Sequence, residues 1–432
     1  MSANATGNAT GSGSGNADAN SDASSDANYD AETDGPPCRS AKSPDELAQL
    51  ILTEEAVEFP GEFRDQDDIS SVTQALAQTT TLRKLFLLIE SYPTDDGAVR
   101  LADAVGRNNT VQELGLHYGG GTVYDGVQAF ENLLLHNTTL LLLYLKSHVD
   151  DEGARAIANG LSHNSTLQTL YLNHCRIGDD GTIAIADALR HNGTLQKLYL
   201  NGNRIGDDGF IAMADALRHN STLQKLFLCR NRIGDDGLIA MADTLRHNST
   251  LLTLDFESNS FGGVSEVGAT ALAGLLRHND AIKVLCLGYC SIGSAGASAL
   301  ANALTNNNTL QELNLEGCGF GEEGVVAFAN ALKLNRGLQE LILSGNNASQ
   351  ATAELFRDVL RYENRTITWL SVYGLSIPWD IEEDIDRLAE INKESVGCTP
   401  QEVAKKKRAE FGPTVNDIYA FVRSFSYLLL DD

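Results

Sequence analysis

Residues 195–220 read Leu-Gln-Lys-Leu-Tyr-Leu-Asn-Gly-Asn-Arg-Ile-Gly-Asp-Asp-Gly-Phe-Ile-Ala-Met-Ala-Asp-Ala-Leu-Arg-His-Asn. Apolar and polar side chains alternate over 195–200, which predicts a short strand. Apolar residues then recur at helical spacing from 211 to 217, which predicts a helix. Asp207 and Asp208 stand at its start, where carboxylates offset the helix dipole. The stretch therefore predicts a strand, a turn and a helix in immediate succession.

The pattern Leu-x-x-Leu-x-Leu recurs along most of the chain with spacings of 27 to 31 residues. Its first positions are Leu82, Val111, Leu140, Leu167, Leu195, Leu223, Leu251, Ile282, Leu310, Leu338 and Ile367. A degenerate copy, Val57-x-Phe59, lies 28 residues before Leu85-x-Leu87. Units of this kind bury their apolar faces by stacking on one another. We therefore expect an α/β fold, a right-handed horseshoe-shaped solenoid with a concave parallel sheet, convex helices and a helical C-terminal cap.

Repeats such as Leu223-Gln-Lys-Leu-Phe-Leu-Cys-Arg-Asn-Arg-Ile-Gly-Asp-Asp-Gly resemble the ribonuclease-inhibitor-like subfamily of leucine-rich repeats. They are similar to the repeats of NOD-like receptors and of Ran GTPase-activating proteins. The resemblance covers roughly residues 55–372. It implies that an Asn or Cys after each strand bonds the backbone of the turn. That column reads Cys175, Asn203, Asn231, Asn259, Cys290, Cys318 and Asn346, and the first repeats depart from it.

The repeats divide the chain into four expected parts. Residues 1–43 form an acidic low-complexity tail, whose composition predicts disorder because it holds little apolar surface to bury. Residues 44–81 are expected to form an N-terminal cap with the degenerate repeat, and residues 82–372 form eleven leucine-rich repeats. Residues 373–432 are expected to form helices that cover the open end of the solenoid.

Three features of the C-terminal part support helices. Asp380–Asn392 carries apolar residues on one helical face, and Thr399-Pro400-Gln401-Glu402 has the pattern of a capping box. A further apolar stripe runs from Val415 to Leu429. A helix that binds a partner is the alternative to a cap here. Lys405–Arg408 is expected to be a solvated basic face, with a nuclear-import signal as its alternative.

The composition limits the classes of partner. The formal net charge of −26 argues against nucleic acid and favours a protein with a basic patch. The longest apolar stretch, Leu140–Leu145, is too short to cross a membrane, and the first residues show no secretory signal. Seven cysteines without a CxxC pair are expected to be thiols. We expect a monomer in the cytoplasm or the nucleus.

No candidate enzyme site emerges, and we expect no catalytic residue, cofactor or metal. A column of histidines from His163 to His278 offers one ligand per repeat, whereas a metal needs convergent ligands. The Gly-Asp-Asp-Gly turns lack the oxygen spacing of a calcium loop. Eight Asn-x-Ser/Thr sequons share one phase of the repeat, so we interpret their asparagines as structural residues at helix ends: Asn108, Asn137, Asn164, Asn192, Asn220, Asn248, Asn307 and Asn364.

The residue between the last two apolar positions of each strand points away from the helices. This column reads Phe86, Gly115, Tyr144, Tyr171, Tyr199, Phe227, Asp255, Cys286, Asn314, Ile342 and Ser371. Four consecutive repeats are therefore expected to expose an aromatic ring, namely Tyr144, Tyr171, Tyr199 and Phe227, with Lys197 and Lys225 beside them. Further along, acidic residues follow on the same face: Glu257, Glu312, Glu316 and Glu340.

Clustered aromatic side chains are typical of protein-binding surfaces. We therefore predict a protein–protein interaction scaffold whose concave face binds a protein through these six aromatic and lysine residues. The alternative for the aromatic column is duplication of a tolerated tyrosine among near-identical repeats. The alternative function is a GTPase-activating regulator of a Ran-type small GTPase, which the resemblance to Ran activators implies.

Overall fold

The predicted strands form a single parallel sheet in the computed structural model, which describes residues 38–411 except 64, 90–96, 119–126, 147–148, 260–263 and 373–377. Within these residues, thirteen strands follow one another across the sheet in chain order. They are β1 (Arg39–Ser40), β2 (Ala56–Gly61), β3 (Lys84–Ile89), β4 (Glu113–Tyr118), β5 (Leu142–Lys146), β6 (Thr169–Tyr171), β7 (Lys197–Tyr199), β8 (Lys225–Phe227), β9 (Thr253–Asp255), β10 (Val284–Cys286), β11 (Glu312–Asn314), β12 (Glu340–Ile342) and β13 (Trp369–Ser371). The eleven predicted segments supply β3 to β13.

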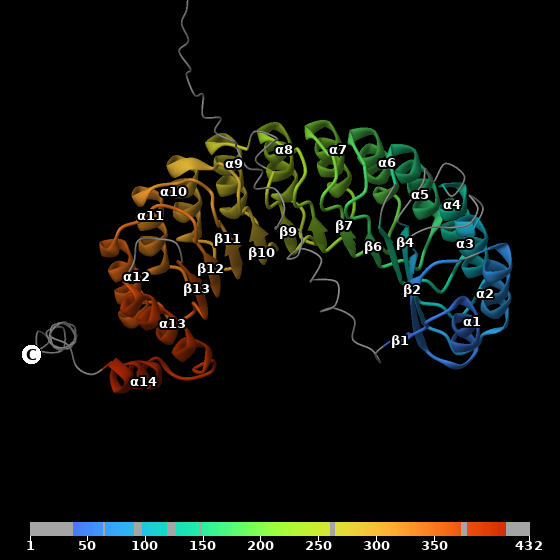
Figure 1. Ribbon diagram of the computed structural model, residues 1–432. Helices are drawn as coiled ribbons and strands as arrows, with labels where there is room; N and C mark the ends of the chain where they lie inside the picture. The colour runs from blue at the N-terminus through green and yellow to red at the C-terminus, as the bar shows by residue number, and fades with distance from the viewer. Residues whose placement is uncertain are drawn as a thin grey trace, which may run out of the picture. The chain divides into compact units, whose positions relative to one another are not determined.

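Each strand is followed by a helix, so the chain alternates between sheet and helix along its length. The helices are α1 (Pro44–Thr53), α2 (Gln66–Gln78), α3 (Gly97–Arg107), α4 (Val127–His136), α5 (Asp151–His163), α6 (Asp179–Leu189), α7 (Asp207–Leu217), α8 (Asp235–Leu245), α9 (Glu266–Leu276), α10 (Gly293–Leu304), α11 (Glu322–Leu332), α12 (Gln350–Tyr362), α13 (Trp379–Lys393) and α14 (Pro400–Phe411). In the repeats the strands line the inside of an arc and the helices lie outside it (Figure 1). The predicted α/β solenoid is confirmed.

The N-terminal edge of the sheet begins earlier than the sequence indicated. Arg39 and Ser40, expected within the low-complexity tail, form β1 and pair with Val57 and Glu58 of β2. The buried Ala41 and the helix cap at Ser43 belong to the same packed region. Two consecutive backbone pairings outweigh the polar composition of residues 39–43, so the expected tail boundary at residue 43 is wrong for these residues.

A buried asparagine at the end of each repeat's helix joins that repeat to the one before. The Nδ2 of Asn220 donates to the carbonyl oxygens of Leu189 at 2.8 Å and Asn192 at 3.1 Å. Its Oδ1 accepts from the backbone N–H groups of Thr222 and Leu223. The amide thus satisfies carbonyls that a helix end leaves without partners. The other seven sequon asparagines are buried in the same role, which confirms the structural interpretation.

A second side-chain column supports the turn after each strand. Asn203 Nδ2 donates to the carbonyls of Leu172 and Leu200, and its Oδ1 accepts from the N–H of Ile177. Asn231 and Asn259 make the same contacts one and two repeats later. In the repeats with cysteine, the thiol donates to the equivalent carbonyl, as Cys318 does to Leu287. The role that the family resemblance implied for this column is confirmed.

The first aspartate of each Asp-Asp pair caps the helix of the next repeat. Gly206, the N-cap of α7, makes no side-chain cap bond. Instead Asp179 of α6 accepts from the N–H groups of Gly206 at 2.7 Å and Gly209 at 3.0 Å through Oδ1. A Cβ on Gly209 would lie 2.8 Å from that oxygen, so a larger residue there would displace the capping carboxylate. The aspartates therefore act between repeats as well as on their own helix.

The C-terminal end of the sheet is covered by α13, as the sequence predicted. Its apolar face, Ile381, Ile385 and Leu388, is buried. The capping box of α14 is also confirmed, because Glu402 accepts from the N–H of Thr399 at 2.7 Å and donates its own N–H to Thr399 Oγ1. The apolar stripe from Val415 to Leu429 lies outside the described residues.

Lys407 of α14 takes the position of the asparagine that a further repeat would supply. Its Nζ donates to the carbonyls of Leu360 and Asn364. Asn364 Nδ2 uses the equivalent pair, Leu332 and Asn335, one repeat earlier. The expectation of a solvated basic face is therefore wrong for Lys407, which is buried, although Lys405, Lys406 and Arg408 are exposed. Burial lowers the pKa of Lys407 to about 7.

Replacing a helix-end asparagine should weaken the solenoid strongly. Asn307→Ala removes bonds to the carbonyls of Leu276 and Asn279 and leaves the N–H groups of Thr309 and Leu310 without an acceptor. We expect the free energy of unfolding to fall by about 2–4 kcal/mol, measured by urea denaturation. The neighbouring Asn306→Ala is the control, since Asn306 is exposed. Equal losses for the two variants would contradict the role of this column.

The C-terminal end should become more stable as the pH rises above neutral. The pKa of Lys407 is about 7 in the folded chain and 10.5 when unfolded, so between these values the unfolded chain binds more protons. Below pH 7 Lys407 is protonated in both the folded and the unfolded chain, so the full cost of burying its charge lowers the stability of the folded chain. The chain's two tryptophans, Trp369 and Trp379, lie at this end, and their fluorescence can follow its unfolding in urea. We expect Lys407→Met to flatten the rise; identical pH profiles would contradict this account.

Candidate functional site

The predicted outward column lies in register across the concave face of the sheet, the face opposite the helices. Phe86 pairs with Gly115, which pairs with Tyr144, and the pairing continues through Tyr171 and Tyr199. From there it runs through Phe227, Asp255, Cys286, Asn314, Ile342 and Ser371. The period of the repeat thus places residues about 28 positions apart directly beside one another.

The aromatic residues of this column stack on each other. The ring centroids of Tyr171 and Tyr199 are 4.0 Å apart, and those of Tyr199 and Phe227 are 4.3 Å apart with nearly parallel planes. Tyr144 packs on Tyr171 at a tilt, with a centroid distance of 5.6 Å. The sequence therefore predicted correctly which aromatic rings lie next to each other on the concave face.

The predicted exposure of the rings is wrong at the centre of the stack. Tyr171 and Tyr199 are only 5% and 7% exposed, because each ring is covered on both faces by its neighbours. Tyr144 and Phe227, at the two ends, are half-buried, as are Lys197 and Lys225 in the adjacent column. The accessible aromatic surface is thus confined to the ends and edges of the stack.

Beyond Phe227 the concave face becomes acidic. Asp255 ends β9 and Glu257 lies just after it, Glu312 and Glu340 pair directly across β11 and β12, and Glu316 lies past the end of β11. Burial, together with like charges, raises the pKa of Glu257 and of Glu312. Burial also raises the pKa of Asp255. Like charges at this spacing lower the stability of the fold, so the packing of the repeats does not explain them.

Two exposed aromatic side chains border the acidic region. Tyr289 is 47% exposed and donates from its hydroxyl to Glu316 at 2.7 Å, and this bond raises its pKa to about 12. Trp369 of β13, 54% exposed, follows Glu340 in the same column of the sheet. Neither residue entered the sequence prediction, because aromatic residues at other phases of the repeat gave no signal until the register was known.

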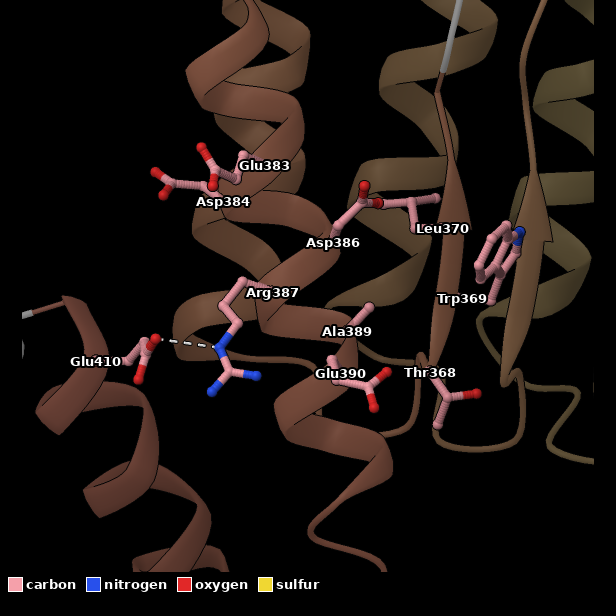
Figure 2. A pocket seen from close by; sticks show the side chains of 10 residues that line it. All are labelled: Thr368, Trp369, Leu370, Glu383, Asp384, Asp386, Arg387, Ala389, Glu390 and Glu410. Carbon is pink, nitrogen blue, oxygen red and sulfur yellow. Dashed lines mark hydrogen bonds and ion pairs between the residues drawn. The ribbon is translucent and has the colours of Figure 1, made fainter.

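A hollow of about 620 Å³ continues the acidic region at the end of the sheet (Figure 2). β13 supplies Trp369 on one side, and α13 supplies Asp386, Arg387 and Glu390 on the other. Arg387 pairs with Glu410 of α14 at 3.1 Å and approaches Glu394 at 3.8 Å. Carboxylates outnumber the single arginine in the lining, so the hollow favours a cationic group.

A family profile described as leucine-rich repeat matches residues 163–186, 191–214, 219–242, 278–301 and 306–329. The chain carries leucine-rich repeats at these positions and has the leucine-rich-repeat fold. A chain of the yeast Rad7–Elc1 complex has a similar structure, with a TM-score of 0.50 and 15% sequence identity over 78% of this chain and 81% of that chain. This likeness supports the leucine-rich-repeat fold alone.

A structure of leiomodin-1 actin-binding site 2 is 25% identical over 37% of this chain and 91% of that chain, with a TM-score of 0.29. A comparison with curated protein sequences gives no match. Across the part of the leucine-rich-repeat chain that the structure describes, no helix combines the length and the apolar character that a membrane crossing requires.

The aromatic stack should contribute to stability, contrary to what exposed rings would imply. Tyr199→Ala removes a ring packed between Tyr171 and Phe227, so we expect the free energy of unfolding to fall by about 2–4 kcal/mol. Tyr289→Ala, at an exposed ring, should have a much smaller effect. Chemical denaturation of both variants tests this, and a negligible loss for Tyr199→Ala would show that the stack adds no stability.

Proposed function

We propose that this leucine-rich-repeat protein is a protein-interaction module that binds a basic segment of a partner on its concave face. The observation that carries the proposal is the line of Glu312, Glu340 and Trp369 on adjacent strands, which leads into the acidic hollow beside α13. Carboxylates beside an exposed indole suit an arginine or lysine side chain, through ion pairing and cation–π contact.

The aromatic and lysine residues form the other half of the proposed surface. The partner would contact the accessible ends of the stack at Tyr144 and Phe227, while Tyr171 and Tyr199 hold these rings rigidly in place. Rigid aromatic side chains lose little conformational entropy on binding, which favours affinity. Lys197 and Lys225 lie on this half and the carboxylates on the other, so the charge distribution would orient the partner along the sheet.

The acidic half can be tested with a labelled oligoarginine peptide and fluorescence anisotropy. We expect Glu312→Gln with Glu340→Gln to weaken binding by roughly tenfold, equivalent to about 1.4 kcal/mol. Trp369→Ala should weaken it several-fold, because one cation–π contact contributes about 0.5–1 kcal/mol at an exposed site. Added salt should weaken the wild type more than the double variant.

The control is Glu152→Gln with Glu323→Gln, which changes the net charge equally at exposed positions of α5 and α11. If both double variants bind the peptide alike, attraction by net charge explains the result and the proposed surface is wrong. Acceleration of GTP hydrolysis when the protein is added to a Ran-type GTPase would replace this proposal with the regulator that the repeat resemblance implies.

A further inference from the structure

Three potential metal ligands converge on the concave face between the aromatic stack and the acidic half. They are Cys229, which follows β8, together with Asp255 at the end of β9 and Glu257 just after it. One ligand atom from each residue lies within 4.8 Å of the other two. All three side chains are half-buried, so solvent reaches the cluster while the protein restrains it.

The local contacts hold the cluster together without neutralising it. Cys229 Sγ donates to Asp255 Oδ1 at 3.1 Å, and the N–H of Glu257 donates to the same oxygen at 3.2 Å. Asn314 Nδ2 donates to Glu257 Oε2 at 3.3 Å, which orients that carboxylate from two repeats away. Arg230 supplies one nearby positive charge against two carboxylates, so a net negative charge is left.

The cluster occurs where the tandem repeats depart from their own pattern. The two preceding repeats place Asn173 and Asn201 at the position of Cys229, and Asn201 Oδ1 accepts from the N–H of the next repeat. In the repeat after Cys229, the equivalent position is occupied by Glu257. In the central concave column, Asp255 occupies the position that Phe227 has one repeat earlier. The neighbouring duplicated sequence therefore does not account for this combination of thiol and carboxylates.

A thiol and two carboxylates are held close enough together to share one cation. A divalent cation stabilises the deprotonated form of each ligand, and the thiol proton is released to solvent.

We propose that Cys229, Asp255 and Glu257 bind a thiophilic divalent cation such as Zn²⁺. Thiolate and carboxylate together suit Zn²⁺, whereas Ca²⁺ and Mg²⁺ prefer all-oxygen sites. Three protein ligands leave a fourth position for water or for a group of a bound partner. The Cys229 proton passes to solvent as the sulfur–metal bond forms. This site departs from the expectation of no metal, which weighed only histidines and the Gly-Asp-Asp-Gly turns.

Titration of the reduced full-length protein with Co²⁺, a spectroscopic substitute for Zn²⁺, tests the proposal. We expect a thiolate-to-cobalt charge-transfer band that saturates at one equivalent and disappears when Zn²⁺ is added. Cys229→Ser should abolish the band, while Cys398→Ser, at an exposed cysteine elsewhere, should keep it. Asp255→Asn and Glu257→Gln should each weaken the affinity by more than about tenfold.

Circular dichroism establishes that each variant is folded, and Cys229→Ser conserves the size of the side chain. A band that survives Cys229→Ser, or no saturable band in the wild type, would overturn the site. Displacement of Co²⁺ by Ca²⁺ as effectively as by Zn²⁺ would also overturn it, because the cluster would then be a non-selective acidic patch. Peptide binding through Glu312 and Glu340 is measured separately with chelator present, so the two proposals can fail independently.

Discussion

The solenoid depends on one buried side-chain amide per repeat. An asparagine such as Asn220 donates to two carbonyls of the preceding repeat and accepts from two N–H groups of its own turn. Both ends of this amide are therefore satisfied away from solvent, where an unpaired polar group would be costly. Because each repeat packs mainly against its two neighbours, the joint must recur along the chain. Lys407 supplies an equivalent donor where the recurrence stops.

This internal frame explains why the concave columns can vary. The apolar strand positions, the two asparagine columns and the aspartates at the helix starts carry the packing between repeats. The central concave column takes no part in the asparagine and aspartate joints, so neighbouring repeats can carry Tyr199, Phe227 and then Asp255 in one line. Because equivalent residues of successive repeats lie side by side, a change of residue between two repeats becomes a boundary on the concave face. Here the boundary separates aromatic from acidic side chains.

Sequence periodicity predicted the features that follow from the repeat itself. Strand positions, the register of the concave column and the structural role of the sequon asparagines required only the phase of each residue. The phase of a residue in the repeat did not predict how exposed its side chain is to solvent. Tyr171 and Tyr199 occupy the predicted column, but rings on adjacent strands lie close enough to cover each other. Lys407 reads as part of a basic run, and only the position of α14 against α12 shows why it is buried.

The candidate sites could not be predicted because they join different columns and different repeats. Trp369 becomes part of a candidate site only through Glu340 on the adjacent strand and through α13 across the hollow. Cys229 approaches Asp255 from one repeat away, whereas Asn314 reaches Glu257 from two repeats away. Burial raises the pKa of Asp255, Glu257 and Glu312, and like charges add to the rise for Glu257 and Glu312, so keeping these acids ionised opposes folding. Positive charge from outside the chain would offset both effects, which argues for a binding role where the residues of the concave face differ from one repeat to the next.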